Sequence, residues 1–303
     1  MEDNTLAEDL SRLLEEPCLS LRRLKTGHSS SATYVAELAG RAVVVKVNDD
    51  ASVLARTGHN LEMLAALGVP VPKLLAYADR SPGPGAVVVM ELIAGVDLRH
   101  VIDELTADQL SVLARQIVDI QRRVAALPAP AGCGFVGIGE RADRLWTDVV
   151  RRPNGYAAAD PLPADAAHLV PWLSRATQSA ATYLDAVTPI AFLDDATTKN
   201  VMISGGRLTG IVDFDVICYG DPLFHVGLTA AAVTANAQRA AARHYVDELV
   251  RFSGLNDDQR RIVDLYEALF LTNFLTAESP HVPGPWRRRA IDGAERALAS
   301  AQR

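Results

Sequence analysis

The chain has 303 residues, of which 49% are hydrophobic, and a formal net charge of −7 at pH 7. That length is enough for one large or two medium domains with a sizeable core. The acidic balance disfavours nucleic-acid binding, which normally requires a basic patch, and no apolar run reaches the ~18 residues of a membrane span.

The cysteines and histidines disfavour two further kinds of protein, those stabilised by disulfides and those that bind zinc. Cys18, Cys133 and Cys218 show no C-x-x-C spacing, which indicates free thiols in a reducing compartment. The seven histidines form no H-x-x-x-H pair of the zinc-binding kind. Because the N-terminus is acidic and lacks the basic-then-apolar form of a signal peptide, we expect a cytoplasmic protein.

The first ninety residues predict a small sheet with two helices. Leucines recur at helical spacing near the N-terminus, β-branched runs alternate with short polar turns, and a V-P-V-P string ends the second helix. The predicted elements are a helix over 5–16, strands over 19–25, 33–38 and 42–47, a helix over 52–67 and a strand over 86–92.

Lys46 stands out because it lies within the β-branched run Ala42–Val47. A buried ammonium needs a partner, so this lysine indicates either a functional site or an edge strand whose lysine faces water. Both interpretations stay open at this point.

The remainder of the chain predicts helices around one hairpin. Apolar residues recur at three and four over 106–127, which is typical of a core-facing helix. Gly132–Gly137 matches G-x-G-x-x-G but follows prolines rather than a strand, so we reject it as a dinucleotide fingerprint. Further helices are expected over 138–188, with a loop at 153–163, and over 224–237, 239–253, 258–277 and 285–300.

The hairpin carries the chemistry. Val201–Ser204 and Leu208–Asp213 flank Gly205-Gly206, and folding them together brings Asp195, Asn200 and Asp213 to one edge. Carboxylate and amide oxygens suit Mg²⁺, and phosphoryl transfer needs metal ions plus a carboxylate that receives the hydroxyl proton. The alternative is a surface hairpin with turn-forming Asp and Asn.

The motifs resemble those of the aminoglycoside-phosphotransferase-like kinases. Asp195–Asn200 reads D-x-x-x-x-N, Ile211–Phe214 reads I-V-D-F, and Gly220–Pro222 reads G-D-P. The protein-kinase pattern is similar but less close. The resemblance implies an α+β, two-lobed protein-kinase-like fold. Its N-lobe, 1–93, would be a small antiparallel sheet, and its larger C-lobe, 94–303, would be mainly helical.

The resemblance also implies a nucleotide site in the N-lobe. Lys46 would hold the α- and β-phosphates of ATP (or GTP), paired with Glu62, for which Glu37 and Asp50 are alternatives. The turn with Ser29 and Ser30 would cover the phosphates. The residues placed by the resemblance against the adenine are Met90, Glu91 and Ile93.

In the C-lobe the resemblance assigns the catalytic groups. Asp195 would be the catalytic base, and Asn200 and Asp213 would hold Mg²⁺. Lys199 replaces a common glycine, and it would touch the γ-phosphate, neutralise Asp194 or remain solvated. Asp221 of G-D-P is expected to cap the next helix.

Two positions depart from the family pattern. The usual H-G-D is here Leu193-Asp194-Asp195, and the last acid of G-D-P-x-x-D is His225. In the family that acid holds the catalytic loop. We hypothesise that Asp194 and His225 form a pair that does the same; the alternative is a solvated Asp194 and a His225 that merely starts a helix.

The resemblance thus implies an ATP-dependent phosphotransferase that moves the γ-phosphate to a hydroxyl of a small molecule, such as an aminoglycoside, amino sugar or amino alcohol. Antibiotic resistance would follow from an aminoglycoside acceptor. Alternatives are a catalytically weak nucleotide-binding pseudokinase and an acyl- or nucleotidyl-transferase. We expect a monomer or homodimer and no nucleic-acid or membrane partner.

Overall fold

The structure is a computed structural model that describes residues 2–24, 31–79, 85–150, 162–277 and 284–302. Ser29 and Ser30 lie outside the described residues, so their predicted role stays a prediction. The chain divides into two compact units. Unit 1 comprises Met1–Ala94 and Gly210–Val216, and unit 2 comprises Gly95–Thr209 and Ile217–Arg303.

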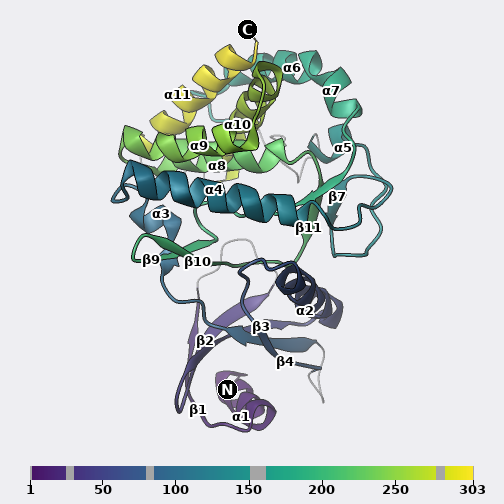
Figure 1. The fold of residues 1–303 in the computed structure, drawn as a ribbon, viewed down its shortest axis with the longest axis vertical. Coiled ribbons are helices and arrows are strands. Elements are labelled where there is room, and N and C mark those ends of the chain that lie inside the picture. The colour runs from purple at the N-terminus through teal and green to yellow at the C-terminus, as the bar shows by residue number, and fades with distance from the viewer. Residues whose placement is uncertain (1, 25–30, 80–84, 151–161, 278–283, 303) are drawn as a thin grey trace. The chain divides into compact units, whose positions relative to one another are not determined.

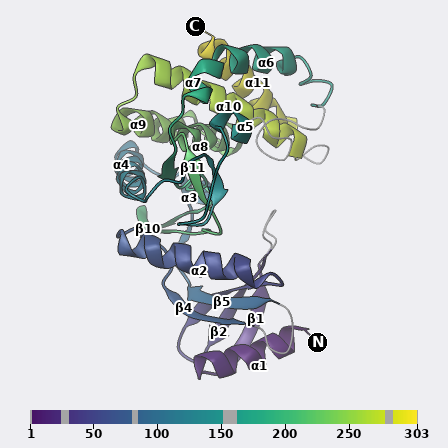
Figure 2. The ribbon, with the colours of Figure 1, turned by 90° about the vertical axis from the view of Figure 1, so that its right-hand side faces the viewer.

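Unit 1 is built on a five-stranded antiparallel sheet with the order β1-β2-β3-β5-β4. Helices α1 (Glu2–Leu14) and α2 (Ala51–Ala66) lie on opposite faces of this sheet (Figure 2). The strands are β1 (Cys18–Arg23), β2 (Ala32–Leu38), β3 (Ala42–Asn48), β4 (Leu74–Asp79) and β5 (Ala86–Glu91).

The alternation of side chains along β3 decides where Lys46 points. Val43 and Val45 pack in the apolar cluster beneath α1, with Leu6 and Leu10. Because successive side chains of a strand face opposite ways, Lys46 faces the α2 side. It lies in the central strand, opposite Thr33 on β2 and Val88 on β5, and is only 7% exposed. The edge-strand interpretation of Lys46 is therefore wrong.

Unit 2 is mainly helical (Figure 1). Helix α8 is buried on nearly every side because its sequence, LFHVGLTAAAVTAN, is apolar around its circumference. It packs against α9, α10 and α11. The helices are α3 (Leu98–Val101), α4 (Ala107–Val124), α5 (Trp146–Val150), α6 (Leu169–Ser179), α7 (Ala181–Asp185), α8 (Leu223–Asn236), η1 (Ala240–Ala242), α9 (Arg243–Ser253), α10 (Asp257–Ala277) and α11 (Gly284–Ala301).

Two three-stranded sheets complete the unit, with the orders β10-β9-β6 and β7-β11-β8. The first contains the predicted hairpin, and its last strand continues into unit 1 at Gly210. The strands are β6 (Val96–Asp97), β7 (Gly134–Val136), β8 (Ile190–Phe192), β9 (Val201–Ser204), β10 (Arg207–Ile211) and β11 (Ile217–Gly220).

An aromatic cluster around Phe224 forms the centre of unit 2. Its ring lies 4.6 Å from that of Phe270, 5.1 Å from Trp146 and 5.3 Å from Tyr266, measured between centroids. Gly220 lies against Trp146, where an added Cβ would come within 2.2 Å of the indole ring. The start of α8 is therefore held by close aromatic packing.

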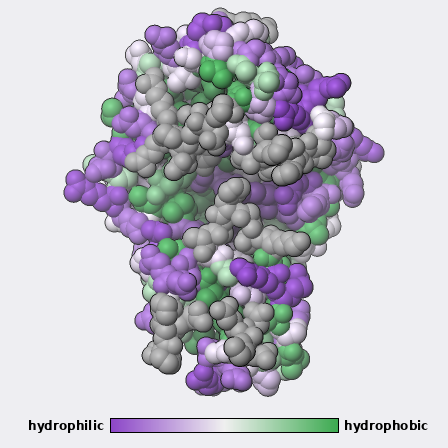
Figure 3. All heavy atoms as spheres, turned by 180° about the vertical axis from the view of Figure 1, so that it is seen from behind, coloured by the Kyte–Doolittle hydropathy of each residue, from purple (hydrophilic) through white to green (hydrophobic). Residues whose placement is uncertain are grey.

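Within the described residues, no helix combines the length and the apolar character that a membrane crossing requires. On the face shown in Figure 3, apolar residues occur in separate groups among hydrophilic ones.

Candidate active site

In unit 1, the D-F-D segment surrounds the buried lysine. Lys46 Nζ lies 2.7 Å from Asp213 Oδ1 and 2.8 Å from Asp215 Oδ1. Burial alone would lower the pKa of Lys46, but the charges and hydrogen bonds of the two carboxylates outweigh it and raise the pKa. The lysine is therefore held as an ammonium between two acids.

Asp213 has a backbone conformation that ordinary residues avoid. Its φ is +74°, in the left-handed region. Among the described non-glycine residues, Glu15 is the other with a positive φ. Such strain costs roughly 1–3 kcal/mol and is concentrated at functional sites. Ile211 donates its N–H to the carbonyl of Pro70 at 2.8 Å. This bond fixes the end of the strand just before Asp213.

Three polar side chains of α2 hold the D-F-D segment. Thr57 Oγ1 donates to Asp215 Oδ1 at 2.7 Å, and Asn60 Nδ2 donates to the carbonyl of Phe214 at 2.9 Å. Arg56 Nε donates to the backbone carbonyl of Asp215 at 3.0 Å. Thus α2 contacts the segment through neutral and cationic groups.

The predicted pairing of Lys46 with Glu62 is wrong. Glu62 is exposed on α2, in the outward stripe that also contains Ala55, His59 and Ala66. Residues spaced by three and four share one helix face, so this stripe lies opposite the buried face. Asp50, an alternative partner, caps α2 by accepting the N–H of Ser52 at 2.9 Å.

The predicted adenine-facing residues occupy the end of β5 and the segment after it. Met90 is buried in the sheet, opposite Val44 and Leu74. Glu91 is exposed, and its N–H donates to the carbonyl of Lys73 at 2.9 Å, while Ile93 is half-buried. Their contact with a nucleotide stays a prediction.

In unit 2, the loop before β9 brings three predicted residues together. Lys199 Nζ lies 2.8 Å from Asp195 Oδ2, and Asn200 Nδ2 donates to the backbone carbonyl of Asp195 at 2.9 Å. Thr197 Oγ1 donates to Asp195 Oδ1 at 3.2 Å. The Asp195 side chain remains 32% exposed. The carboxylate is thus oriented by its own loop while solvent still reaches it.

Asp194, next to this carboxylate, is buried. Its pKa is raised to about 7, chiefly by desolvation and then by the charge of Asp195, although backbone N–H groups of both residues hydrogen-bond to it. The alternative of a solvated Asp194 is therefore wrong.

His225 holds the same loop through a different contact from the one predicted. Its Nε2 lies 3.0 Å from the carbonyl oxygen of Ala196 and therefore donates to it. Burial lowers the pKa of the imidazole to about 4, so the ring is neutral. The Asp194–His225 pair is not formed, because Asp194 takes backbone N–H groups and His225 takes a carbonyl.

Gln121 on α4 fixes the start of the loop. Its Nε2 donates to the carbonyl of Leu193 at 2.8 Å, and its Oε1 accepts the N–H of Leu193 at 2.9 Å. Sequence reasoning missed this role. The available signal in the sequence was a glutamine, Gln121, within the apolar stripe of the helix predicted over 106–127.

Asp221 has a structural environment. It accepts hydrogen bonds from Tyr183 at 2.9 Å, from Tyr266 at 2.8 Å and from the N–H of Leu223 at 3.0 Å. Burial raises its pKa. Pro222 occupies the N-cap position of α8, and Asp221, one residue earlier, accepts the N–H of Leu223, the first residue of the helix.

The candidate metal ligands are oxygen donors. Among the described residues, no group of three or more His, Cys, Asp or Glu side chains forms a cluster that could hold a metal ion. Asp213 in unit 1 is 47% exposed, and Asn200 in unit 2 offers an amide oxygen. This chemistry fits Mg²⁺, which prefers oxygen and keeps water and phosphate ligands.

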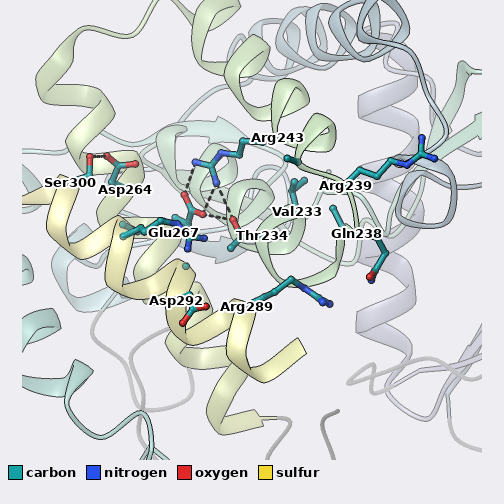
Figure 4. A pocket seen from close by; sticks show the side chains of 15 residues that line it. Val233, Thr234, Gln238, Arg239, Arg243, Asp264, Glu267, Arg289, Asp292 and Ser300 are labelled. Carbon is teal, nitrogen blue, oxygen red and sulfur yellow. Dashed lines mark hydrogen bonds and ion pairs between the residues drawn. The ribbon is translucent and has the colours of Figure 1, made fainter. Parts of the chain in front are cut away.

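A separate cavity of about 520 Å³ lies between α8, α9, α10 and α11 (Figure 4). Arg243 binds Glu267 there through two bonds of 2.7 and 2.9 Å and also donates to Thr234. Arg239 and Arg289 extend away from that pair (Figure 4) and donate to backbone carbonyls. The labelled arginines of this cavity do not point toward a common centre (Figure 4), so we interpret the cavity as a junction between helices.

Comparisons with known proteins found a matching family and several similar solved structures. The model of the phosphotransferase enzyme family matches residues 20–262. A complex of a thermostable mutant of aminoglycoside phosphotransferase APH(4)-Ia with ADP and hygromycin B is similar, with a TM-score of 0.69, 18% identity and 98% of each chain covered. The GDP complex of aminoglycoside 2'-phosphotransferase-IIIa has a TM-score of 0.68, 17% identity and 99% of each chain covered. No curated protein sequence matched.

These structural likenesses confirm the predicted α+β kinase-like fold, with its antiparallel sheet and its mainly helical remainder. At identities of 17–18% they concern the fold. The family match covers most of the sequence, including Lys46, the loop with Asp195 and the D-F-D segment. The chain therefore belongs to the phosphotransferase enzyme family.

Proposed function

We propose that this chain is a nucleotide-dependent phosphotransferase that moves the γ-phosphate of ATP, or GTP, to a hydroxyl of a small molecule. The observation that carries the proposal is the buried Lys46, held by the two acids of D-F-D, in a chain that also orients an accessible Asp195 carboxylate. Phosphoryl transfer depends on this combination of positioning and charge.

The proposed roles follow from the chemistry of each side chain. Lys46 binds the α- and β-phosphates. Asp213 and Asn200 hold Mg²⁺, which supplies charge neutralisation on the phosphates. Asp195 receives the proton of the acceptor hydroxyl, and Lys199 orients its carboxylate through the 2.8 Å ion pair. His225 and Gln121 keep the loop backbone in place.

For the acceptor we propose an aminoglycoside-like compound, an amino sugar or an amino alcohol. The related structures support this class, since one contains hygromycin B and another, of APH(2")-IIia, contains kanamycin. The altered loop, Leu193-Asp194-Asp195, indicates a divergent member. With an aminoglycoside antibiotic as the acceptor, the activity would confer resistance to it. The free cysteines agree with a cytoplasmic location.

The test is ADP release from Mg·ATP with a panel of aminoglycosides, amino sugars, amino alcohols and macrolides. Asp195→Ala serves as the blank, and Asp258→Ala, whose side chain is 86% exposed on α10, is the matched control. We expect a hit that is lost in Asp195→Ala and kept in Asp258→Ala. A hit that survives Asp195→Ala would refute the role of this carboxylate.

A nucleotide-binding pseudokinase is the second candidate, and the exposed Glu62 favours it because the expected lysine partner is not in place. It predicts nucleotide-dependent stabilisation in a thermal-shift assay with no ADP release across the panel.

A further inference from the structure

We propose that Asp215, rather than Glu62, is the residue that positions Lys46 for nucleotide binding. This inference rests on the proposed function. It assigns the second acid of D-F-D a role that the sequence motif does not reveal, and it explains how a chain with an exposed Glu62 can still present an oriented lysine.

The contacts of Asp215 meet at one oxygen. Its Oδ1 lies 2.8 Å from Lys46 Nζ and accepts the Thr57 hydroxyl at 2.7 Å. The other acceptor within reach of this hydroxyl, the carbonyl of Val53, is neutral and farther away, at 3.0 Å. A carboxylate that accepts both bonds links β3, α2 and the D-F-D segment. Because the charged bonds are the stronger kind, this oxygen fixes the position of the ammonium relative to α2.

The backbone of the segment is held independently. Arg56 donates to the carbonyl of Asp215 at 3.0 Å, and Asn60 donates to the carbonyl of Phe214 at 2.9 Å. These donors stand on α2 at positions one turn apart. Asp215 is therefore anchored at both its main chain and its side chain, as a positioning residue needs to be.

The two acids differ in exposure, which divides their roles. The Asp213 side chain is 47% exposed, whereas that of Asp215 is 25% exposed. Asp213 is thus the carboxylate more available to a divalent cation, and Asp215 is the one that stays with Lys46. With both present, Lys46 retains a partner when Asp213 takes another ligand.

Glu62 cannot replace Asp215 without a change in α2. It belongs to the outward stripe, whereas Thr57 and Asn60 belong to the buried face. A rotation of the helix that turned Glu62 inward would break the bonds of Thr57 and Asn60 to the D-F-D segment. The two arrangements are mutually exclusive.

The experiment measures Mg·ADP affinity by calorimetry for the full chain and four variants. Thr57→Val removes the hydroxyl at nearly constant volume, and Thr57→Ser restores it. Asp215→Asn removes the charge, and Glu62→Gln is the matched control on the same helix. Melting temperatures establish that each variant is folded.

We expect Asp215→Asn to weaken Mg·ADP binding about 10-fold or more, because Lys46 loses a charged partner. Thr57→Val should weaken it by a smaller factor, because the hydroxyl acts on Lys46 only through Asp215. Thr57→Ser and Glu62→Gln should bind like the wild type. Where an acceptor is known, the KM for ATP should rise more than kcat falls.

Two results would overturn the assignment while leaving the proposed function intact. One is wild-type affinity in Asp215→Asn, and the other is a loss in Glu62→Gln as large as that in Asp215→Asn. Equal losses in Thr57→Val and Thr57→Ser would show that the hydroxyl has no part. A wild-type chain that binds no nucleotide would refute the proposed function itself, and this inference with it.

Discussion

Replacing Asp194 with asparagine should stabilise the protein at neutral pH and above. The side chain is only 9% exposed, and its folded-state pKa is about 7 against an ordinary value of 3.8. A carboxyl whose pKa is raised on folding contributes stability that is fully present below pH 3.8 and is lost as the pH rises through 7. Asparagine keeps an acceptor for the backbone N–H groups and carries no charge.

The size of the stabilisation follows from the difference between the ordinary and the folded-state pKa of Asp194. From 3.8 to about 7, at about 1.4 kcal/mol per pH unit, the difference amounts to about 4 kcal/mol. His225 acts in the opposite direction. Its pKa falls from 6.5 to about 4, so its contribution is present above pH 6.5 and declines toward pH 4. Between pH 4 and 6.5 the two slopes offset each other in the wild type.

The assay is urea unfolding of the wild type and Asp194→Asn from pH 4 to 8.5. The variant should equal the wild type near pH 4 and exceed it in free energy of unfolding by about 4 kcal/mol above pH 8. It should also show an acid-sensitive slope due to His225, which the wild type hides. A difference between the two proteins that does not change with pH would refute the reasoning.

Three further perturbations test the site and its support. Asp195→Asn should lower turnover by roughly 10²–10⁴-fold with little change in melting temperature; an unchanged rate would contradict its role as base. His225→Asp should lower the melting temperature more than His225→Gln, because a buried carboxylate would face the backbone carbonyl that the imidazole now contacts; equal stability would contradict this contact. Gly220→Ala should destabilise the fold by about 1–3 kcal/mol, because its Cβ would come within 2.2 Å of Trp146. Gly40→Ala, which has open space around it, is the control for thermal unfolding.

Elements with a strong internal period were predictable from the sequence. The leucine stripe of α4 and the β-branched runs of β3 and β5 lie within two or three residues of their predicted bounds. Strands such as β7 and β8, of three residues each, were missed. Such short segments have no periodicity of their own, and their pairing with β11 joins positions far apart in the chain.

The candidate site was predictable by residue type but not by partner. Because Lys46 lies in a β-branched strand that is expected to be buried, it needs a carboxylate partner. The sequence does not show which acid supplies that partner. The periodicity of α2 did indicate that Glu62 faces outward, because Glu62 directly follows Leu61, which faces inward. The bond of His225 had no such signal, because the choice between a carboxylate and a carbonyl depends on the backbone path of the loop.

The discontinuity of unit 1 limits how the protein can be divided. A fragment that ends at Ala94 would contain Lys46 but neither Asp213 nor Asp215, because Gly210–Val216 is supplied later in the chain. A buried ammonium without its partners is strongly destabilising. We therefore expect a fragment of the first ninety-four residues not to fold stably on its own. A truncated chain that is meant to keep this unit must therefore retain Gly210–Val216 as well as the first ninety-four residues.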